Sequence, residues 1–409
     1  MSVFTSSSVR PLLMRAVAQA LEAIFIENQY ADRVIERALR QNPKAGSRDR
    51  AFIAETTYEV VRYYRLYSAI LGSEPQTEEH FWQLVGIHLL LQKGGEEVLR
   101  LSEMRRLRPD VLRARAAELR QQRPYRESIP DWLDALGQQQ LGERWEETLT
   151  WLNRPAEVVL RANRLKVSRE ALQERLQSEG IETRPHGPAD ALVLLRRQNV
   201  FATKAFREGL FEVQDYSSQQ VAPLLDVQPG MRVVDACAGG GGKTLHLAAL
   251  MQGKGAIIAL DTLAWKLDEL RKRARRAGAH NVETRVIENS KTIKRLYNSA
   301  DRLLLDVPCS GLGVLRRNPD SKWKLSPEFI ENLQKTQQNI LQQYSRIVRP
   351  GGLVVYATCS LLPMENQEQV NAFLTSPAGE DFECCTEKTL WPQDEGFDGF
   401  YMALLRRKG

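Results

Sequence analysis

Apolar residues recur every three or four positions from about residue 9 to residue 145, which is the spacing of one face of an α-helix. Prolines and glycines, among them Pro43, Pro109 and Pro124, interrupt this pattern and divide it into short helices. We therefore predict one all-α domain over residues 1–150. The first apolar run consists of Leu12, Leu13, Ala16, Val17, Ala20, Leu21, Ile24 and Phe25.

The hydrophobic pattern changes at Pro155. The segment AEVVLRANRLKV predicts a strand, SREALQERLQSEG a capped helix that ends at Gly180, and ADALVLLRR another strand. A further strand, turn and helix in GLFEVQDYSSQQVAPLLDVQPG lead into the next unit. Residues 151–230 are therefore predicted to form a small α+β module.

From Met231 onward, nearly continuous apolar strands alternate with helices. The predicted strands lie in RVVDACA, AIIALD, NVETRVI, RLLLDVP and GGLVVYATCS. Apolar strands separated by helices are typical of a parallel sheet that is covered on both faces. We predict that residues 231–409 form a doubly wound α/β domain, so the fold class is α/β.

Length and charge add to this picture. A chain of 409 residues exceeds one ordinary domain, and the net charge of +6 is unevenly distributed. The segments 1–150, 151–230 and 231–409 sum to 0, +1 and +5, so an attraction to phosphates is concentrated in the last domain. No apolar run approaches the roughly 20 residues of a membrane span, and the first residues show no cleavage site. We expect a cytoplasmic monomer with no membrane partner.

A glycine-rich loop in VVDACAGGGGKT follows the first strand of this last domain. A phosphate-binding P-loop would require glycine where Cys237 stands. The alternative is a nucleoside-cofactor loop with a second acid at the end of the next strand, and Asp261 lies 26 positions after Asp235. S-adenosylmethionine carries no pyrophosphate, so a loop without the dinucleotide spacing suits it better. We favour this methyl donor as the cofactor.

Two further strands run into turns that contain a cysteine, LLLDVPCSGLG with Cys309 and VVYATCSLLPMEN with Cys359. In a parallel sheet both turns lie at the carboxyl edge, where ligands bind. A thiolate that adds to carbon-6 of a pyrimidine turns carbon-5 into a nucleophile for a methyl group, and a carboxyl such as Asp306 can stabilise the adduct. The cysteines lack metal-site spacing, so no metal is expected.

Residues 150–409 resemble the Sun and nucleolar-antigen family of RNA cytosine carbon-5 methyltransferases. The resemblance is carried by GLFEVQDYSSQ, DACAGGGGKT, DVPCSGLGVLRRNPDSKW, YATCSLLPMENQEQV and DGFYMALLRR. The helical domain resembles the NusB-like N-terminus of a bacterial member, and the small module is similar to an RRM-like domain. The resemblance implies a class I methyltransferase domain over residues 231–409.

The resemblance also implies roles for single residues. Cys359 would attack the base, Cys309 would assist release of the methylated RNA, and Asp306 would contact the cytosine. Asp261 would hold the ribose of the cofactor, and Lys243 would reach the active site. The implied contacts with S-adenosylmethionine are Cys237, Ala238, Gly239, Gly240, Gly241, Gly242, Lys243, Asp261, Asn289 and Asp306.

Two positions depart from the family pattern. Gly239 and Gly240 replace the usual Ala and Pro of the loop, and Asn289 stands where an aspartate usually holds the adenine. After the first cysteine turn, RRNPDSKW is typical of an RNA-facing loop or of a surface loop anchored by Trp323. The cations expected to bind RNA are Arg316, Arg317, Lys322 and Lys324.

The resemblance favours small-subunit (16S) ribosomal RNA as the substrate. Two alternatives stay open, a transfer-RNA methyltransferase of the same family and a non-catalytic RNA-binding assembly factor. A P-loop NTPase is disfavoured by the missing first glycine. A cytosine stacked in a duplex is out of reach of Cys359, so the target should be single-stranded or flipped out.

Overall fold

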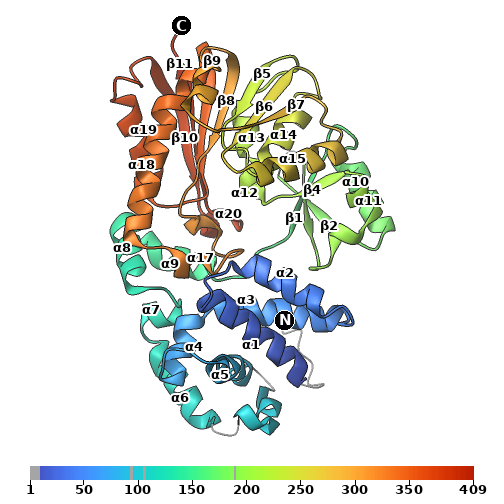
Figure 1. Ribbon diagram of the computed structural model, residues 1–409, viewed down its shortest axis with the longest axis vertical. Coiled ribbons are helices and arrows are strands. Elements are labelled where there is room, and N and C mark those ends of the chain that lie inside the picture. Colours follow the sequence, from blue (N-terminus) through green and yellow to red (C-terminus); the bar gives the residue numbers. More distant parts are fainter. Residues whose placement is uncertain (1–9, 93–94, 105–106, 188–189) are drawn as a thin grey trace. The chain divides into compact units, whose positions relative to one another are not determined.

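The chain folds into two units that are described separately. The computed structural model describes residues 10–92, 95–104, 107–187 and 190–409 (Figure 1). One unit comprises Met1–Arg154 and Leu315–Leu325, and the other comprises Pro155–Val314 and Ser326–Gly409. Residues 1–9, the start of the predicted helical domain, lie outside the described residues.

The first unit is all α-helical, as predicted, apart from short 3-10 turns. Its helices are α1 (Pro11–Phe25), α2 (Ala31–Gln41), α3 (Ser47–Arg62), α4 (Tyr64–Leu71), α5 (Glu78–Leu90), α6 (Pro109–Leu119), α7 (Arg123–Arg126), α8 (Asp131–Leu141), α9 (Arg144–Leu152) and α17 (Ser321–Lys324). The short helix α17 belongs to this unit although it comes late in the chain.

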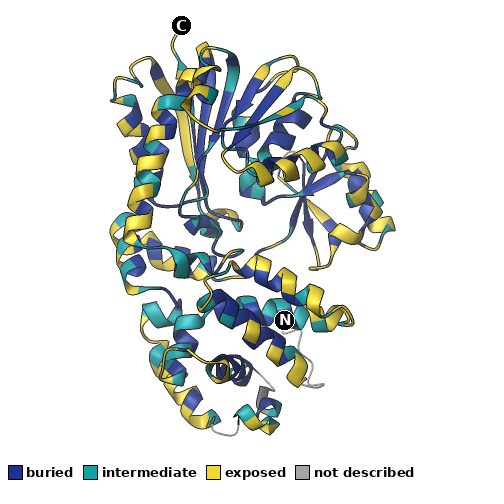
Figure 2. Ribbon diagram, in the orientation of Figure 1, coloured by how far each residue is buried: buried dark blue, intermediate teal, exposed yellow. Residues whose placement is uncertain are grey.

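Helix α5 is the centre of the helical unit. Every residue from Phe81 to Leu90 is buried, including the polar Gln83 and His88, so this helix needs neighbours on every side (Figure 2). Thr77 caps its N-terminus by accepting a hydrogen bond from the His80 amide. Helix α1 packs against α5 with a stripe that includes Val17 and Leu21 of the predicted face, together with Met14, which the prediction did not include.

The second unit begins with a four-stranded antiparallel sheet in the order β2-β3-β1-β4. Helix α10 follows β1 and the short helix α11 precedes β4, giving the βαββαβ connection of a ferredoxin-like fold. Strand β2 was not expected from the sequence, because it is short, mostly exposed and contains Pro185. The bounds are β1 (Val159–Ala162), α10 (Arg169–Ser178), β2 (Thr183–His186), β3 (Ala191–Leu194), α11 (Lys204–Arg207) and β4 (Phe211–Val213).

The rest of this unit is built on a seven-stranded sheet in the order β10-β11-β9-β8-β5-β6-β7. The five strands from β9 to β7 are parallel, which confirms the doubly wound prediction, while β11 runs antiparallel to both of its neighbours, β9 and β10. Their bounds are β5 (Arg232–Asp235), β6 (Ala256–Asp261), β7 (Val282–Val286), β8 (Ala300–Asp306), β9 (Val348–Thr358), β10 (Phe382–Leu390) and β11 (Phe400–Arg407).

Both faces of the large sheet are covered by helices. On β5, Val233 packs into one apolar cluster with Leu245 and Leu270, whereas its neighbour Val234 packs into another with Phe373. Successive side chains of a strand point to opposite faces, so each strand contributes side chains to the hydrophobic core on either face of the sheet. The helices around this sheet are α12 (Tyr216–Gln219), α13 (Val221–Leu224), α14 (Gly242–Leu250), α15 (Ala264–Ala277), α16 (Ser290–Lys294), α18 (Pro327–Tyr344), α19 (Gln367–Leu374) and α20 (Pro392–Glu395).

The described helices differ from membrane-spanning segments. None of them combines the length and the apolar character that crossing a bilayer requires.

Candidate active site

The two predicted cysteines meet at the carboxyl edge of the large sheet. Strands β8 and β9 are parallel neighbours, with Asp306 opposite Ala357, and each strand runs directly into one cysteine turn. The Val307 amide continues the ladder by donating to the Ala357 carbonyl at 3.0 Å. As a result the Sγ atoms of Cys309 and Cys359 lie 3.3 Å apart, and both side chains are partly exposed. The register of two neighbouring strands thus brings together thiols that are fifty positions apart.

The pKa of the Cys309 thiol is raised well above its ordinary value. The main cause is the hydrogen bond with Cys359, followed by burial and by the negative charges of Cys359 and Glu365. Cys309 therefore keeps its proton at neutral pH. The pKa of Cys237 is also raised well above normal, by burial and by the charges of Asp235 and Asp306, so this thiol stays neutral as well.

Lys243 and Asp306 form an ion pair beside the thiols. Lys243 lies in the first turn of α14, and its Nζ atom is 2.6 Å from Oδ2 of Asp306, the last residue of β8. Burial alone would lower the pKa of Lys243, but the charge and hydrogen bond of Asp306 outweigh it, and a negative Cys359 raises this pKa further. The pKa of Lys243 is raised overall, so the site holds a permanent cation next to Asp306.

The glycine loop is fixed by Asp261, the acid at the end of β6. Its Oδ2 atom accepts a hydrogen bond from the Gly239 amide at 2.9 Å, and its Oδ1 atom accepts one from the Leu263 amide at 2.8 Å. Each carboxylate oxygen keeps a lone pair that can accept from a ribose hydroxyl. Gly239 has φ +54°, a left-handed conformation that glycine adopts freely, and a Cβ there would meet no atom within 4 Å. The loop and Asp261 therefore fit a nucleoside cofactor.

Asp235 is a buried carboxyl at the end of β5. Its Oδ2 atom accepts a hydrogen bond from the Thr244 hydroxyl at 2.7 Å, while Oδ1 has no partner among the described residues. Burial raises its pKa to about 7, against the effect of the Thr244 hydrogen bond, and the charge of Asp306 raises it further.

Asn289 lies past the end of β7, the strand next to β6, and is exposed. Its Oδ1 atom accepts a hydrogen bond from the Lys291 amide at 2.9 Å and so caps helix α16. The second lone pair of this oxygen is the feature that the expected adenine contact would use.

The segment 315–325, which carries the cations expected to bind RNA, packs inside the helical unit. Lys322 is 2% exposed, and its ammonium group donates to the carbonyls of Arg62 at 2.8 Å and Glu127 at 3.4 Å. Arg316 is also buried. These surroundings do not fit the expected phosphate contacts, because both cations face the interior. The sequence offers no local signal of this, since the partners lie in α3 and near α7.

Trp323 explains why the segment folds inward. Its indole N–H donates to the Val61 carbonyl at 2.7 Å, and its ring meets the edge of Tyr64 with centroids 5.6 Å apart. The alternative of a loop anchored by Trp323 therefore describes the segment better than an RNA-facing loop. Arg317 and Lys324 remain partly exposed, and Lys324 donates to Asn28 Oδ1 at 3.0 Å.

Two other sequence features are now located. The basic run on α15 is largely occupied within its own unit, since Arg273 and Arg276 both pair with the buried Glu212 of β4. This tie joins the ferredoxin-like module to the cofactor loop, because Arg273 also donates to the Gly240 carbonyl at 2.6 Å. The adjacent Cys384 and Cys385 are exposed on β10.

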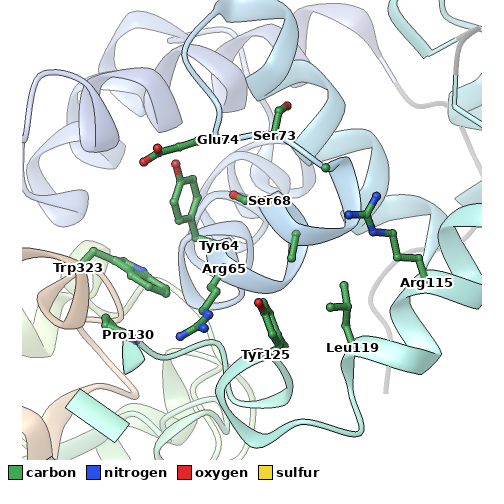
Figure 3. A pocket seen from close by; sticks show the side chains of 12 residues that line it. Tyr64, Arg65, Ser68, Ser73, Glu74, Arg115, Leu119, Tyr125, Pro130 and Trp323 are labelled. Atoms are coloured by element: carbon green, nitrogen blue, oxygen red, sulfur yellow. The ribbon is translucent and has the colours of Figure 1, made fainter. Parts of the chain in front are cut away.

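A hollow of about 650 Å³ lies wholly within the helical unit (Figure 3). Arg65 is fixed beside it by an ion pair of 2.7 Å with Asp131 and by its position over the Tyr125 ring, 4.6 Å from the centroid. None of the residues of the cysteine site lines it. The lining residues are Tyr64, Arg65, Ser68, Ala69, Gly72, Ser73, Glu74, Arg115, Leu119, Tyr125, Pro130 and Trp323.

The strand order, the glycine loop and Asp261 define a class I methyltransferase that uses S-adenosylmethionine as its cofactor. Residues 222–406 match the family model of the 16S rRNA methyltransferase RsmB/F, and residues 129–201 match the ferredoxin-like domain of RsmF/B-like methyltransferases. The chain belongs to this RsmB/F family of Sun methyltransferases and lies close to RsmB.

Individual relatives agree with this assignment. The chain is 31% identical to the probable ribosomal RNA small subunit methyltransferase B of Synechocystis, over 93% of this chain and 96% of the relative. It is 32% identical to ribosomal RNA small subunit methyltransferase B of Vibrio cholerae, over 88% and 90%. Among solved structures, a methyltransferase homologue protein from Pyrococcus horikoshii matches 70% of this chain and 97% of its own, with 28% identity and a TM-score of 0.62.

Proposed function

We propose that this protein transfers a methyl group from S-adenosylmethionine to carbon-5 of a cytosine in 16S ribosomal RNA, through a covalent adduct with Cys359. The observation that carries the proposal is the pair of thiols 3.3 Å apart, next to the Lys243–Asp306 ion pair. The loop residues 237–243 and Asp261 would hold the cofactor, which supplies an electrophilic methyl group when bound. The names of the relatives favour small-subunit rRNA as the substrate.

The chain's own groups divide the work of the reaction. The Cys359 thiolate adds to carbon-6 of the cytosine, which turns the ring into an enamine whose carbon-5 takes the methyl group. The Lys243 cation favours the thiolate, and the Asp306 carboxylate accepts a hydrogen bond from the cytosine amino group. A water molecule then takes the carbon-5 proton, and the electron pair left on carbon-5 expels the Cys359 sulfur as a thiolate and restores the aromatic ring. Cys309, protonated and in contact with Cys359, assists this release.

Two cysteine variants test this proposal. The protein is incubated with labelled S-adenosylmethionine and either 16S rRNA or transfer RNA, and the nucleosides are analysed for 5-methylcytosine. We expect Cys359→Ala to be inactive and Cys309→Ala to accumulate a denaturant-resistant protein–RNA adduct. Cys385→Ala, which removes an exposed thiol on β10, is the matched control and should keep wild-type activity.

The other outcomes separate the alternatives. Methyl transfer by Cys359→Ala at the wild-type rate would refute the nucleophile assignment. Label in transfer RNA alone would support the transfer-RNA alternative, and binding of ribosomal RNA without any transfer would support an assembly factor. A methylated base other than 5-methylcytosine would contradict the proposed chemistry.

A further inference from the structure

Glu365, in the turn before α19, is a carboxylate buried beneath both cysteine turns and is 0% exposed. Its Oε1 atom accepts hydrogen bonds from the Ser310 amide at 2.8 Å and from Gln337 Nε2 at 3.0 Å. Its Oε2 atom accepts from the hydroxyls of Ser310 and Ser360, each at 2.5 Å. The four lone-pair sites of the carboxylate are all filled by donors, so the group is satisfied in its ionised form.

The donors to Glu365 are the residues that follow the two cysteines. Ser310 comes directly after Cys309 and Ser360 directly after Cys359, and their hydroxyl oxygens lie 3.1 Å apart. The amide group of Gln337, fully buried on α18, also donates to the Pro308 carbonyl at 2.9 Å, just before Cys309. One carboxylate thus joins both turns and the helix behind them.

The backbone of Glu365 is also held in place, by a residue of β9. Its backbone carbonyl accepts a hydrogen bond from the Tyr356 hydroxyl at 2.6 Å, and Tyr356 is a fully buried residue of β9. Among the residues that the structure describes, Glu365 forms no ion pair. An unneutralised buried charge acts strongly on neighbouring groups, because the interior screens it weakly. The negative charge of Glu365 adds to the hydrogen bond and burial that raise the pKa of Cys309.

We propose that Glu365 is a positioning residue that sets the spacing of the two thiols through Ser310 and Ser360 and places a buried negative charge beside the Cys309 turn. A Cys309 that keeps its proton next to the nucleophile suits the role of a release group. This inference rests on the proposed function for its effect on catalysis, but the thiol spacing and the Cys309 proton are properties of the free protein.

The charge is tested by Glu365→Gln, which keeps the shape of the side chain. The rate of Cys309 alkylation by iodoacetamide is measured against pH, with the modified peptides identified by mass spectrometry. Loss of the negative charge should shift the Cys309 midpoint to lower pH by about one unit. The matched control is Glu368→Gln, an exposed residue three positions further on, which should leave the midpoint unchanged. A folded Glu365→Gln protein with the control's midpoint would overturn the charge effect.

The spacing is tested by Ser360→Ala, which removes one tether and keeps the carboxylate. We expect methyl transfer to fall roughly tenfold to hundredfold, because small displacements of reacting groups are costly. The Cys309 midpoint should also move to lower pH, because the hydrogen bond with Cys359 is the main cause of its raised pKa. Methyl transfer at the wild-type rate would refute the role of Ser360 in spacing the thiols. If Glu365→Gln fails to fold, Ser360→Ala is the variant that tests the positioning role. The alkylation assay uses no RNA, so a different substrate would refute the proposed function without affecting the Cys309 result.

Discussion

The cysteine site and the helical unit each enclose a lysine, and the two lysines differ in what surrounds their ammonium groups. Lys243 faces the carboxylate of Asp306, and its pKa is raised although burial opposes this. Among the described residues, the partners at hydrogen-bonding distance of Lys322 are backbone carbonyls, and burial lowers its pKa well below normal. At the cysteine site the lysine stays charged next to the reacting groups. In the helical unit the lysine instead links backbone carbonyls of different segments. Residue type and sequence charge alone do not separate these two uses.

The largest effect is expected when the charge of Lys243 is removed. Lys243→Met should lower methyl transfer about 100-fold or more, because one electrostatic group at the reacting centre is lost. Initial rates with labelled S-adenosylmethionine measure this change. Lys322→Met is the counterpart in the helical unit, and its rate per folded molecule should stay within about twofold of wild type. Equal losses of methyl-transfer rate in both variants would contradict the claim that only Lys243 takes part in the reaction.

Truncation of Lys322 should instead reduce stability. Lys322→Ala removes a buried stem and leaves the carbonyls of Arg62 and Glu127 without their donor, which costs about 3 kcal/mol of unfolding free energy. Denaturant unfolding followed by tryptophan fluorescence measures the loss, with the partly exposed Lys324→Ala as control. A Lys322→Ala protein of wild-type stability that binds RNA weakly would show that Lys322 contacts RNA after all.

The helical unit should also lose stability in acid because of His88. Burial lowers the pKa of this histidine from 6.5 to about 4, while its ring nitrogens contact the Tyr67 hydroxyl and the Gln92 amide. Above pH 6.5 it is neutral in both states, so its contribution is complete there. Between pH 6.5 and 4 only the unfolded state gains the proton, and stability falls by about 3 kcal/mol in total.

The measurement is the unfolding free energy as a function of pH for the wild type and for His88→Gln. The variant should show a shallower decline between pH 6.5 and 4, because it lacks the group that titrates. Identical slopes would contradict the assignment of this acid sensitivity to His88.

The smallest effect is expected at Arg317, a partly exposed cation of the segment 315–325. If it contacts a phosphate, Arg317→Ala should weaken RNA binding by a few fold and reduce the slope of affinity against salt by about 1. Filter binding at several salt concentrations measures both values. Lys322→Met should leave the slope unchanged, and a reduced slope in that variant would place Lys322 at the RNA.

The sequence predicted the fold wherever the pattern was local and long. The run Leu12 to Phe25 became α1, and the alternation of apolar strands with helices became the parallel part of the large sheet. Strand β2 was not predicted, because its exposed positions and Pro185 give no alternation of apolar and polar residues. The antiparallel addition of β11 beside β9 is a long-range pairing, and nothing in the local pattern of Phe400–Arg407 specifies its direction.

The site was predictable where each residue follows a strand. Cys309, Cys359, Asp306 and Asp261 were expected at one sheet edge, and the structure places them there. Glu365 was missed because a glutamate at the start of the polar run ENQEQ suggests a surface turn. The available signal was the serine after each cysteine, which supplies the matching donors. Lys322 could not be located, because its partners are more than 190 positions away.

The inward fold of residues 315–325 has a practical consequence for taking the protein apart. A fragment that stops at Arg154 would contain every long helix of its unit but lack the segment that brings Trp323. The Val61 carbonyl would lose its indole partner and the edge of the Tyr64 ring would be uncovered. Such a fragment should aggregate or fold poorly unless residues 315–325 are supplied as a peptide or through a linker. The segment between α9 and β1 therefore separates the two units along the chain, but truncation of the protein there should not give a stable helical fragment.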